Sequence, residues 1–158
     1  MEQRLARGEV GTAWIAGVTV HSLRVIEDER GALLHMLRAD SPLFRRFGEV
    51  YFSEVRAATV KAWRRHTQMT QHFAVPVGRV KFVIYDDRAG SPSEHGLVEC
   101  ELGRPDAYQL LVVPPLVWYG FKGLGISPSI VANCSDIPHD PAEIVRLDHR
   151  TGSIPYTW

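Results

Sequence analysis

Two basic side chains separated by one residue are the strongest candidates for chemistry in this sequence. Arg64 and His66 lie in a strand-like segment, and alternate residues of a β-strand face the same side of a sheet. A guanidinium stays protonated near neutral pH and can hold an anion, whereas an imidazole titrates close to neutrality and can accept a proton. The pair could therefore support proton transfer beside a group that becomes negatively charged.

Purely structural roles for the same two side chains remain open. Arg64 could instead be buried against a carboxylate such as Glu49, because a buried guanidinium without a partner is costly. His66 could be an interior histidine that is hydrogen-bonded to Gln68, Gln71 or water.

Many short strand-like segments surround this pair, and glycine, proline and aspartate separate them. This pattern is typical of an all-β sandwich or barrel. The predicted strands are 18–26, 32–37, 50–56, 59–64, 71–77, 79–85, 97–102, 108–113 and 129–133. Ser41-Pro42 opens a short helical or irregular piece, and Asp140-Pro141 predicts one helical turn with Asp140 as its N-cap. The apolar tail, 154–158, is expected to dock on the body.

Length and composition indicate an ordinary soluble protein with one domain, residues 1–158. The net charge is +0, which gives no general attraction to nucleic acid or an anionic membrane. No apolar run approaches the roughly 20 residues of a membrane helix, and the N-terminus lacks the apolar core of a signal peptide. Cys100 and Cys134 are expected to be free thiols. A cytoplasmic protein is expected, in which a local basic cluster must hold any anionic ligand.

The segments 64–78 and 114–119 resemble the two metal-binding motifs of cupin barrels in spacing but not in ligands. Arg64 and His66 stand where those motifs have two histidines, Gln71 replaces the glutamate, and Tyr119 replaces the last histidine. Arginine does not ligate metals because it stays protonated, and one His, one Gln and one Tyr make a poor divalent site. We therefore expect a cupin or jelly-roll β-barrel without a metal or another cofactor.

A narrower resemblance is to the dTDP-4-dehydrorhamnose 3,5-epimerase family, and it extends from about Val18 to the C-terminus. The matching segments are 28–31, 60–64, 87–93, 114–121, 133–136 and 146–148. The resemblance implies a homodimer that binds a sugar nucleotide, with no nucleic-acid or membrane partner. It also implies proton abstraction beside a 4-keto group, by a histidine that an aspartate orients, with a tyrosine as the acid.

The reaction-facing positions depart from that family pattern. Arg64 stands at the position of the base, Ala132 at that of the tyrosine, and Tyr119 at that of the second-motif histidine. Related 3,4-ketoisomerases carry a G-x-H-A-H pair, and by that resemblance His66 becomes the base. Tyr119 is then the acid or a proton shuttle, and Arg64 holds the enolate oxygen.

The remaining site residues follow from the same resemblance. Lys61 and Arg30 are expected to contact the diphosphate, with surface salt bridges as the alternative, and Gln71, Glu49 and Tyr51 are expected to contact the substrate. Asp148 and His149 both remain candidates for orienting the base. Two functions stay open. One is a metal-free epimerase or isomerase of a dTDP-linked 4-keto-6-deoxy sugar, and the other is a non-catalytic cupin that binds a sugar nucleotide or another small anion.

Overall fold

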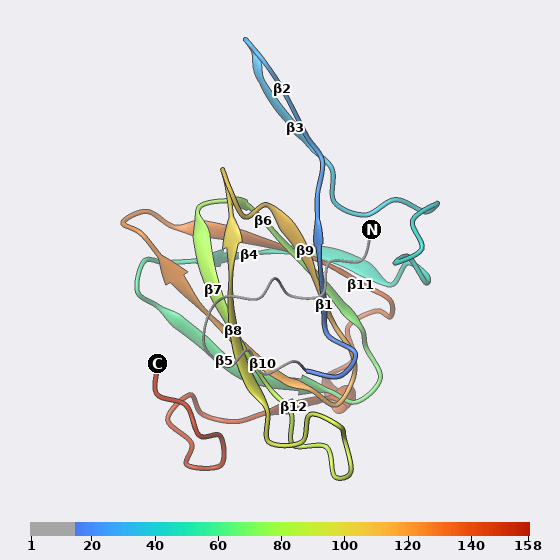
Figure 1. Cartoon of the computed structure of the whole chain (residues 1–158), viewed down its shortest axis with the longest axis vertical. Coiled ribbons are helices and arrows are strands. Elements are labelled where there is room, and N and C mark those ends of the chain that lie inside the picture. Colours follow the sequence, from blue (N-terminus) through green and yellow to red (C-terminus); the bar gives the residue numbers. More distant parts are fainter. Residues whose placement is uncertain (1–14) are drawn as a thin grey trace.

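Two five-stranded antiparallel sheets form the body of the protein in a computed structural model that describes residues 15–158 (Figure 1). The first sheet has the order β1-β9-β6-β11-β4 and the second has the order β12-β5-β10-β7-β8. The first sheet comprises β1 (Thr19–Ser22), β4 (Glu49–Val55), β6 (Gln71–Val77), β9 (Gln109–Val113) and β11 (Ser129–Ser135). The second comprises β5 (Val60–His66), β7 (Arg79–Tyr85), β8 (Leu97–Gly103), β10 (Trp118–Leu124) and β12 (Ile144–Arg146). The predicted all-β jelly-roll class is confirmed.

An aromatic core fills the space between the two sheets. The ring of Phe73, on β6, lies 5.2 Å from those of Phe82 and Tyr119, and Phe82 lies 5.2 Å from Phe121. These side chains are at most 3% exposed. Because they alternate with outward-facing residues along their strands, they define which face of each strand points inward.

Strands β6 and β7 match their predicted ranges, whereas β10 and β12 were not predicted. Gly78, at φ 80°, makes the turn between β6 and β7. Strand β10 was not predicted because it contains two glycines, Gly120 and Gly123, and glycine weakens the sequence pattern of a strand. A neighbouring segment approaches each of them closely: Gly120 faces the methyl group of Ala62, and Gly123 faces the backbone carbonyl of Arg56.

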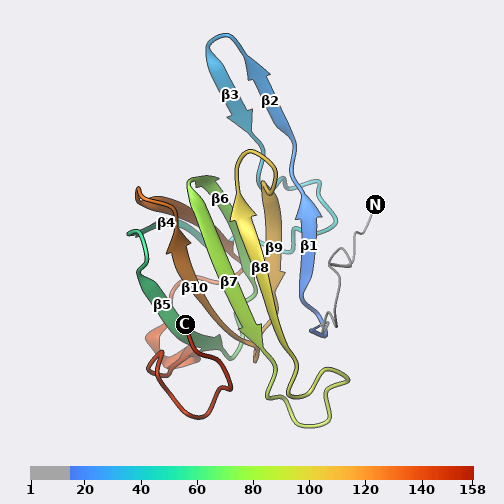
Figure 2. The same cartoon turned by 60° about the vertical axis from the view of Figure 1, so that its left-hand side comes forward.

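The predicted strand 18–26 is two strands, β1 and β2 (Val25–Asp28). Strand β2 pairs with β3 (Gly31–Leu34) in a separate two-stranded hairpin. Figure 2 shows that this hairpin projects away from the two sheets. The chain pairs with β9 up to Ser22 and with β3 from Val25, so the single strand predicted from the sequence is two strands.

The helical turn near the C-terminus is confirmed as the 3-10 helix η1 (Pro141–Glu143). Asp140 is its N-cap and accepts a hydrogen bond from the amide of Ala142 at 2.9 Å. The piece that begins at Ser41 is irregular and forms turns. The tail docks as expected, because the Trp158 ring lies 5.0 Å from that of Trp63. Within residues 15–158, no helix is long and apolar enough to cross a membrane.

Candidate active site

A hydrogen-bonded chain of three buried side chains links β5, β10 and η1. One ring nitrogen of His66, Nδ1, pairs with the Glu143 carboxylate, and the other, Nε2, lies 3.0 Å from the hydroxyl of Tyr119. The His66 and Tyr119 rings are nearly parallel, at 8°, with centroids 5.9 Å apart. The residues are between 2% and 6% exposed. His66 and Tyr119, predicted separately from distant motifs, thus form one unit.

The backbone after β5 fixes the Glu143 carboxylate. Its second oxygen accepts hydrogen bonds from the amides of Thr67, Gln68 and Met69 at 3.0, 3.1 and 3.3 Å. Burial alone would raise the pKa of Glu143, but the hydrogen bonds from His66 and from these amides outweigh it and lower that pKa. Glu143 is therefore a fixed carboxylate that stays ionised near neutral pH.

This carboxylate sets the tautomer of His66. An ionised carboxylate only accepts hydrogen bonds, so Nδ1 carries the proton and Nε2 presents its lone pair to the Tyr119 hydroxyl. Burial lowers the pKa of His66 below its usual value, although Glu143 pulls in the other direction. Burial also raises the pKa of Tyr119, and the nearby Arg64 guanidinium opposes that rise. Near neutral pH the unit is a neutral phenol that donates to a neutral imidazole.

Arg64 lies directly opposite Tyr119 in the pairing of β5 with β10. Directly opposed side chains of an antiparallel pair share a face, so the half-buried Arg64 points inward with the core-facing Tyr119. Lys61 lies earlier on β5, and its ammonium donates to the Ser53 hydroxyl at 2.8 Å and to the Glu54 carbonyl at 2.6 Å. Burial and then the Arg64 charge lower the pKa of Lys61. Arg64 therefore lies beside Tyr119, and Lys61 lies close enough to Arg64 for their charges to interact.

A second polar network lies on the first sheet, around the fully buried Asn133 of β11. The Asn133 amide donates to the Tyr51 hydroxyl at 2.9 Å and to the side-chain oxygen of Gln71, and its oxygen accepts from the amide of His72 at 3.1 Å. Tyr51 and Gln71 were predicted as substrate contacts, but Asn133 was not. The side-chain nitrogen of Gln71 is buried and has no hydrogen-bond partner among residues 15–158. Such a donor is costly to bury and is ready for an acceptor.

Two predicted contacts lie apart from these networks within the chain. Arg30 is at the tip of the projecting hairpin, where its side chain is 82% exposed and pairs with Asp28 at 2.6 Å. Glu49 begins β4, and no ion pair joins it to Arg64 among the residues that the structure describes. The structural alternative for Arg64, a partner carboxylate at Glu49, is therefore not what the chain forms.

Known proteins with similar sequences and structures identify the family. No family model matches the chain. A dTDP sugar isomerase from Desulfovibrio desulfuricans G20 has a solved structure with 52% identity and a TM-score of 0.90, covering 91% of this chain and 92% of that one. A probable low-salt glycan biosynthesis epimerase from Haloferax volcanii is 36% identical over 121 residues, which cover 75% of this chain and 77% of that protein. The chain belongs to the dTDP-sugar epimerase and isomerase family.

More distant members share the fold. A dTDP-6-deoxy-D-glucose-3,5-epimerase from Legionella pneumophila, solved with dTDP-4-keto-L-rhamnose, is 19% identical with a TM-score of 0.77, over 89% of this chain and 78% of that one. The likeness extends along most of the described chain, as the sequence resemblance predicted.

Among the candidates for the residue that orients the base, neither sequence prediction was right. Asp148 is 73% exposed and pairs weakly with His149 at 3.9 Å, whereas Glu143 holds His66. The signal for Glu143 was the predicted helical turn at Asp140-Pro141, which ends on an acidic residue. Nothing in the sequence indicated that this turn lies beside the end of β5. Within residues 15–158, no group of three or more His, Cys, Asp or Glu side chains is placed to hold a metal ion.

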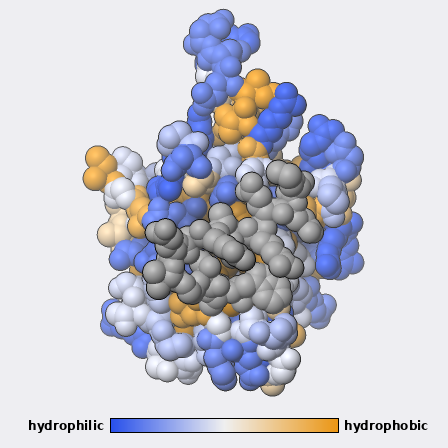
Figure 3. Space-filling view, in the orientation of Figure 1, coloured by the Kyte–Doolittle hydropathy of each residue, from blue (hydrophilic) through white to orange (hydrophobic). Residues whose placement is uncertain are grey.

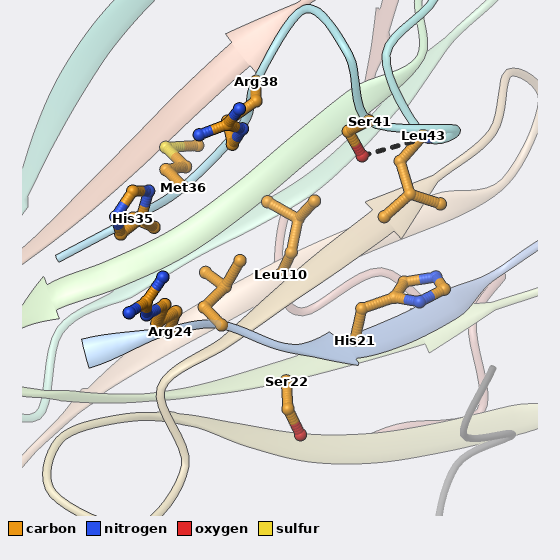
Figure 4. A pocket seen from close by; sticks show the side chains of 10 residues that line it. His21, Ser22, Arg24, His35, Met36, Arg38, Ser41, Leu43 and Leu110 are labelled. Atoms are coloured by element: carbon orange, nitrogen blue, oxygen red, sulfur yellow. Dashed lines mark hydrogen bonds between the residues drawn. The ribbon is translucent and has the colours of Figure 1, made fainter. Parts of the chain in front are cut away.

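A cavity of about 380 Å³ lies elsewhere, between the outer side of β1 and β9 and the segment that follows β3 (Figure 4). His21, Arg24, His35 and Arg38 contribute its polar lining, and Arg38 pairs with Asp40 at 2.6 Å. None of the predicted site residues lines this cavity. It is separate from the unit formed by His66 and Tyr119.

Proposed function

We propose that this protein is a metal-free epimerase or isomerase of a dTDP-linked 4-keto-6-deoxy sugar. The observation that carries the proposal is the chain from Glu143 through His66 to Tyr119, with the Arg64 guanidinium facing the same interior. The relatives support the substrate class, since one is named a dTDP sugar isomerase and another a probable epimerase of glycan biosynthesis.

The chemistry begins at a carbon beside the ketone, where a proton is acidic because the resulting charge moves to oxygen. His66 is the base, and it acts through Tyr119: the phenol oxygen takes the carbon-bound proton while its own proton passes to Nε2 of His66. Arg64 is placed to hold the enolate oxygen, and the free amide nitrogen of Gln71 is a second donor. Glu143 is a positioning residue that keeps Nε2 ready to accept.

We also propose a homodimer in which the β2–β3 hairpin contacts a second copy of the chain. A two-stranded hairpin is marginally stable alone, yet this one exposes Ile26 at 42% and Leu33 at 57%. Figure 3 shows apolar surface on the hairpin below its polar tip. A second copy would cover those side chains, and it would bring Arg30 to a neighbouring barrel as a diphosphate contact.

Within this proposal the enzyme acts in the cytoplasm. Cys100 and Cys134 are both free thiols, which is compatible with a reducing compartment.

Proton exchange tests the proposed activity. The protein is incubated in D₂O with a dTDP-4-keto-6-deoxyhexose, and the protons at C3 and C5 are followed by NMR. We expect exchange, and His66→Gln should slow it by about 10²–10⁴-fold, the usual contribution of a general base. His72→Gln is the matched control, because His72 is also buried but its ring nitrogens face the carbonyls of Cys134 and Leu43 and not Tyr119.

The non-catalytic alternative gives a different pattern. A thermal shift with dTDP, about 2.7 kcal/mol of stabilisation at 100 times Kd, without exchange at either carbon would replace the enzyme with a binding protein. Exchange that is unaffected by His66→Gln would remove the proposed base.

Light scattering tests the dimer. The intact protein should have twice the mass of the chain, and Leu33→Asp on the hairpin should shift it towards monomer. Ile126→Asp is the matched control, since Ile126 is 98% exposed and lies beyond the end of β10. A monomeric intact protein at tens of micromolar would contradict the proposal.

A further inference from the structure

In the proposed mechanism, the groups that remove the proton and hold the enolate oxygen lie on the second sheet. Tyr119 and Arg64 belong to β10 and β5 of the second sheet, and His66 ends β5. Because a hydrogen bond of 3.0 Å joins His66 to Tyr119, the two reach a substrate from the same side. They therefore supply one face of a sugar ring. Inversion at a carbon needs a second donor, since the proton must return to the opposite face.

Tyr51 is placed on the opposing sheet. It lies on β4, where it alternates with the exposed Val50 and Phe52 and shares its inward face with the core residue Val55. It is directly opposite Asn133 in the pairing of β4 with β11, so the two side chains share that face. Tyr51 is also close enough to Tyr119 that its phenolate form would raise the pKa of Tyr119.

Asn133 leaves the Tyr51 hydroxyl with an unused proton. The amide nitrogen of Asn133 donates to the Tyr51 oxygen at 2.9 Å, so the phenol accepts there, and its own O–H is given to no other group of residues 15–158. Asn133 cannot turn round to accept instead, because its oxygen holds the amide of His72. The same network leaves the Gln71 amide nitrogen buried and without a partner in the part of the chain that the structure describes. The Tyr51 hydroxyl and the Gln71 amide nitrogen, both on the first sheet, can therefore each donate a hydrogen bond to a substrate.

We propose that Tyr51 is the second catalytic acid, which protonates the substrate carbon from the face opposite Tyr119, and that the reaction is therefore an inversion. This inference rests on the proposed function. Tyr119 takes the proton from the carbon as His66 takes the phenolic proton, and the carbon–hydrogen electrons move into the enolate. The Tyr51 O–H then breaks, its proton bonds to the other face of the same carbon, and the ketone re-forms.

After the reaction, exchange with solvent restores the starting protonation of Tyr51 and of His66. Tyr51 is half-buried and regains a proton from water, while the imidazolium of His66 returns its proton through Tyr119. The amide of Asn133 stabilises the phenolate of Tyr51 between these steps, because a donor to oxygen favours its charged form. Asn133 is a positioning residue in this account.

Tyr51→Phe separates removal of the proton from its return. With the hydroxyl gone, Tyr119 still removes the proton and returns a solvent deuteron to the same face. We expect exchange at the substrate carbon within about threefold of the intact protein, and formation of the inverted sugar about 10²-fold slower or more. Both rates come from one NMR time course in D₂O with a dTDP-4-keto-6-deoxyhexose.

Tyr85→Phe is the matched control, since Tyr85 lies on β7 in the separate cluster around Trp63 and Trp118. It should leave exchange and inversion unchanged. Thermal melts with dTDP show that each variant is folded and binds nucleotide. A KM increase that slows exchange and inversion equally would make Tyr51 a substrate contact and overturn the proposal.

Other outcomes are equally decisive. Inversion by Tyr51→Phe at the intact rate overturns the acid role. A product of the intact protein with its ketone moved to C3, and no inverted sugar, shows transfer along one face and also overturns it. If the intact protein shows no exchange at all, the proposed function itself is wrong, whereas the two preceding outcomes contradict only the role of Tyr51.

Discussion

The substitution Glu143→Gln should separate folding from catalysis at this site. The glutamine oxygen can still accept from the amides of Thr67, Gln68 and Met69, but its NH₂ group then faces His66. His66 must present a lone pair at Nδ1 and carry its proton at Nε2, which reverses the hydrogen bond to Tyr119. An imidazole in that tautomer cannot take the phenolic proton.

The two effects differ in size. Hydrogen bonds to a charged group contribute about 1.5–3 kcal/mol each and neutral ones about 0.5–1.5. Thr67 and Gln68 are exposed and can use water, so the loss falls mainly on Met69 and His66 and totals about 1–2 kcal/mol. A wrong tautomer costs on the order of 10⁴-fold in a hydrolase triad, and we expect a loss of about 10³–10⁴-fold here.

Urea unfolding and the rate of deuterium exchange measure these two quantities. Asp136→Asn is the matched control, because the buried Asp136 also accepts a backbone amide of this loop, that of Thr70 at 2.8 Å, without touching His66. It should change stability by a similar amount and leave the rate within a few-fold. A folded Glu143→Gln protein that exchanges within tenfold of the intact rate would refute the tautomer argument.

Acid should remove the stability advantage of the intact protein over Glu143→Gln. The pKa of Glu143 is lowered from 4.5, so the carboxylate stabilises the folded state fully above pH 4.5. That contribution declines as the pH falls through the lowered folded-state pKa. Urea unfolding at pH 7 and pH 3 should show the two proteins converging, and a constant difference would contradict the assignment.

Three further outcomes are expected. Because burial lowers the pKa of His66 from 6.5, kcat/KM should be level above pH 6.5 and fall at lower pH, as measured by exchange rates across buffers. Asp86→Ala should lower the free energy of unfolding by about 3–5 kcal/mol, as measured in urea, because the Arg88 guanidinium would lose its carboxylate partner. The fully buried Asp86 binds that guanidinium at 2.7 and 2.9 Å. Gly120→Ala should lower stability by about 1–3 kcal/mol in thermal melts, because the added methyl overlaps Ala62.

The sequence predicts a strand correctly where one face of that strand is buried and therefore carries apolar residues. Strands β6 and β7 carry apolar residues at inward positions and are separated by Gly78, so their ends coincide with the prediction. Strand β10 was missed because Gly120 and Gly123 are selected by the close approach of neighbouring backbone, which leaves no local signature. The hairpin was missed as a separate element because periodicity does not reveal which strand lies alongside.

The site was readable from sequence only where its residues share a strand. Arg64 and His66 alternate on β5, and the prediction that they face one way agrees with the pairing of Arg64 with Tyr119. Glu143 and Asn133 reach the site because segments far apart in the chain pair there: β12, which follows Glu143, with β5, and β11 with β4. Their roles depend on hydrogen bonds between residues 61 to 82 positions apart, which no local pattern encodes.

A barrel interior lets catalytic groups occupy new positions without changing the reaction. What an inversion requires is a base on one side of the sugar ring and an acid on the other, whatever their sequence positions. Ala132, which was predicted to face the reaction, pairs with the exposed Phe52 and so lies on the outward face of its sheet, whereas Tyr51 pairs with Asn133 on the inward face. Arg64 cannot accept a proton, yet His66 follows it on the same face of β5. Substitution at one inward position is therefore weak evidence for lost activity when an adjacent inward position carries the same chemical group.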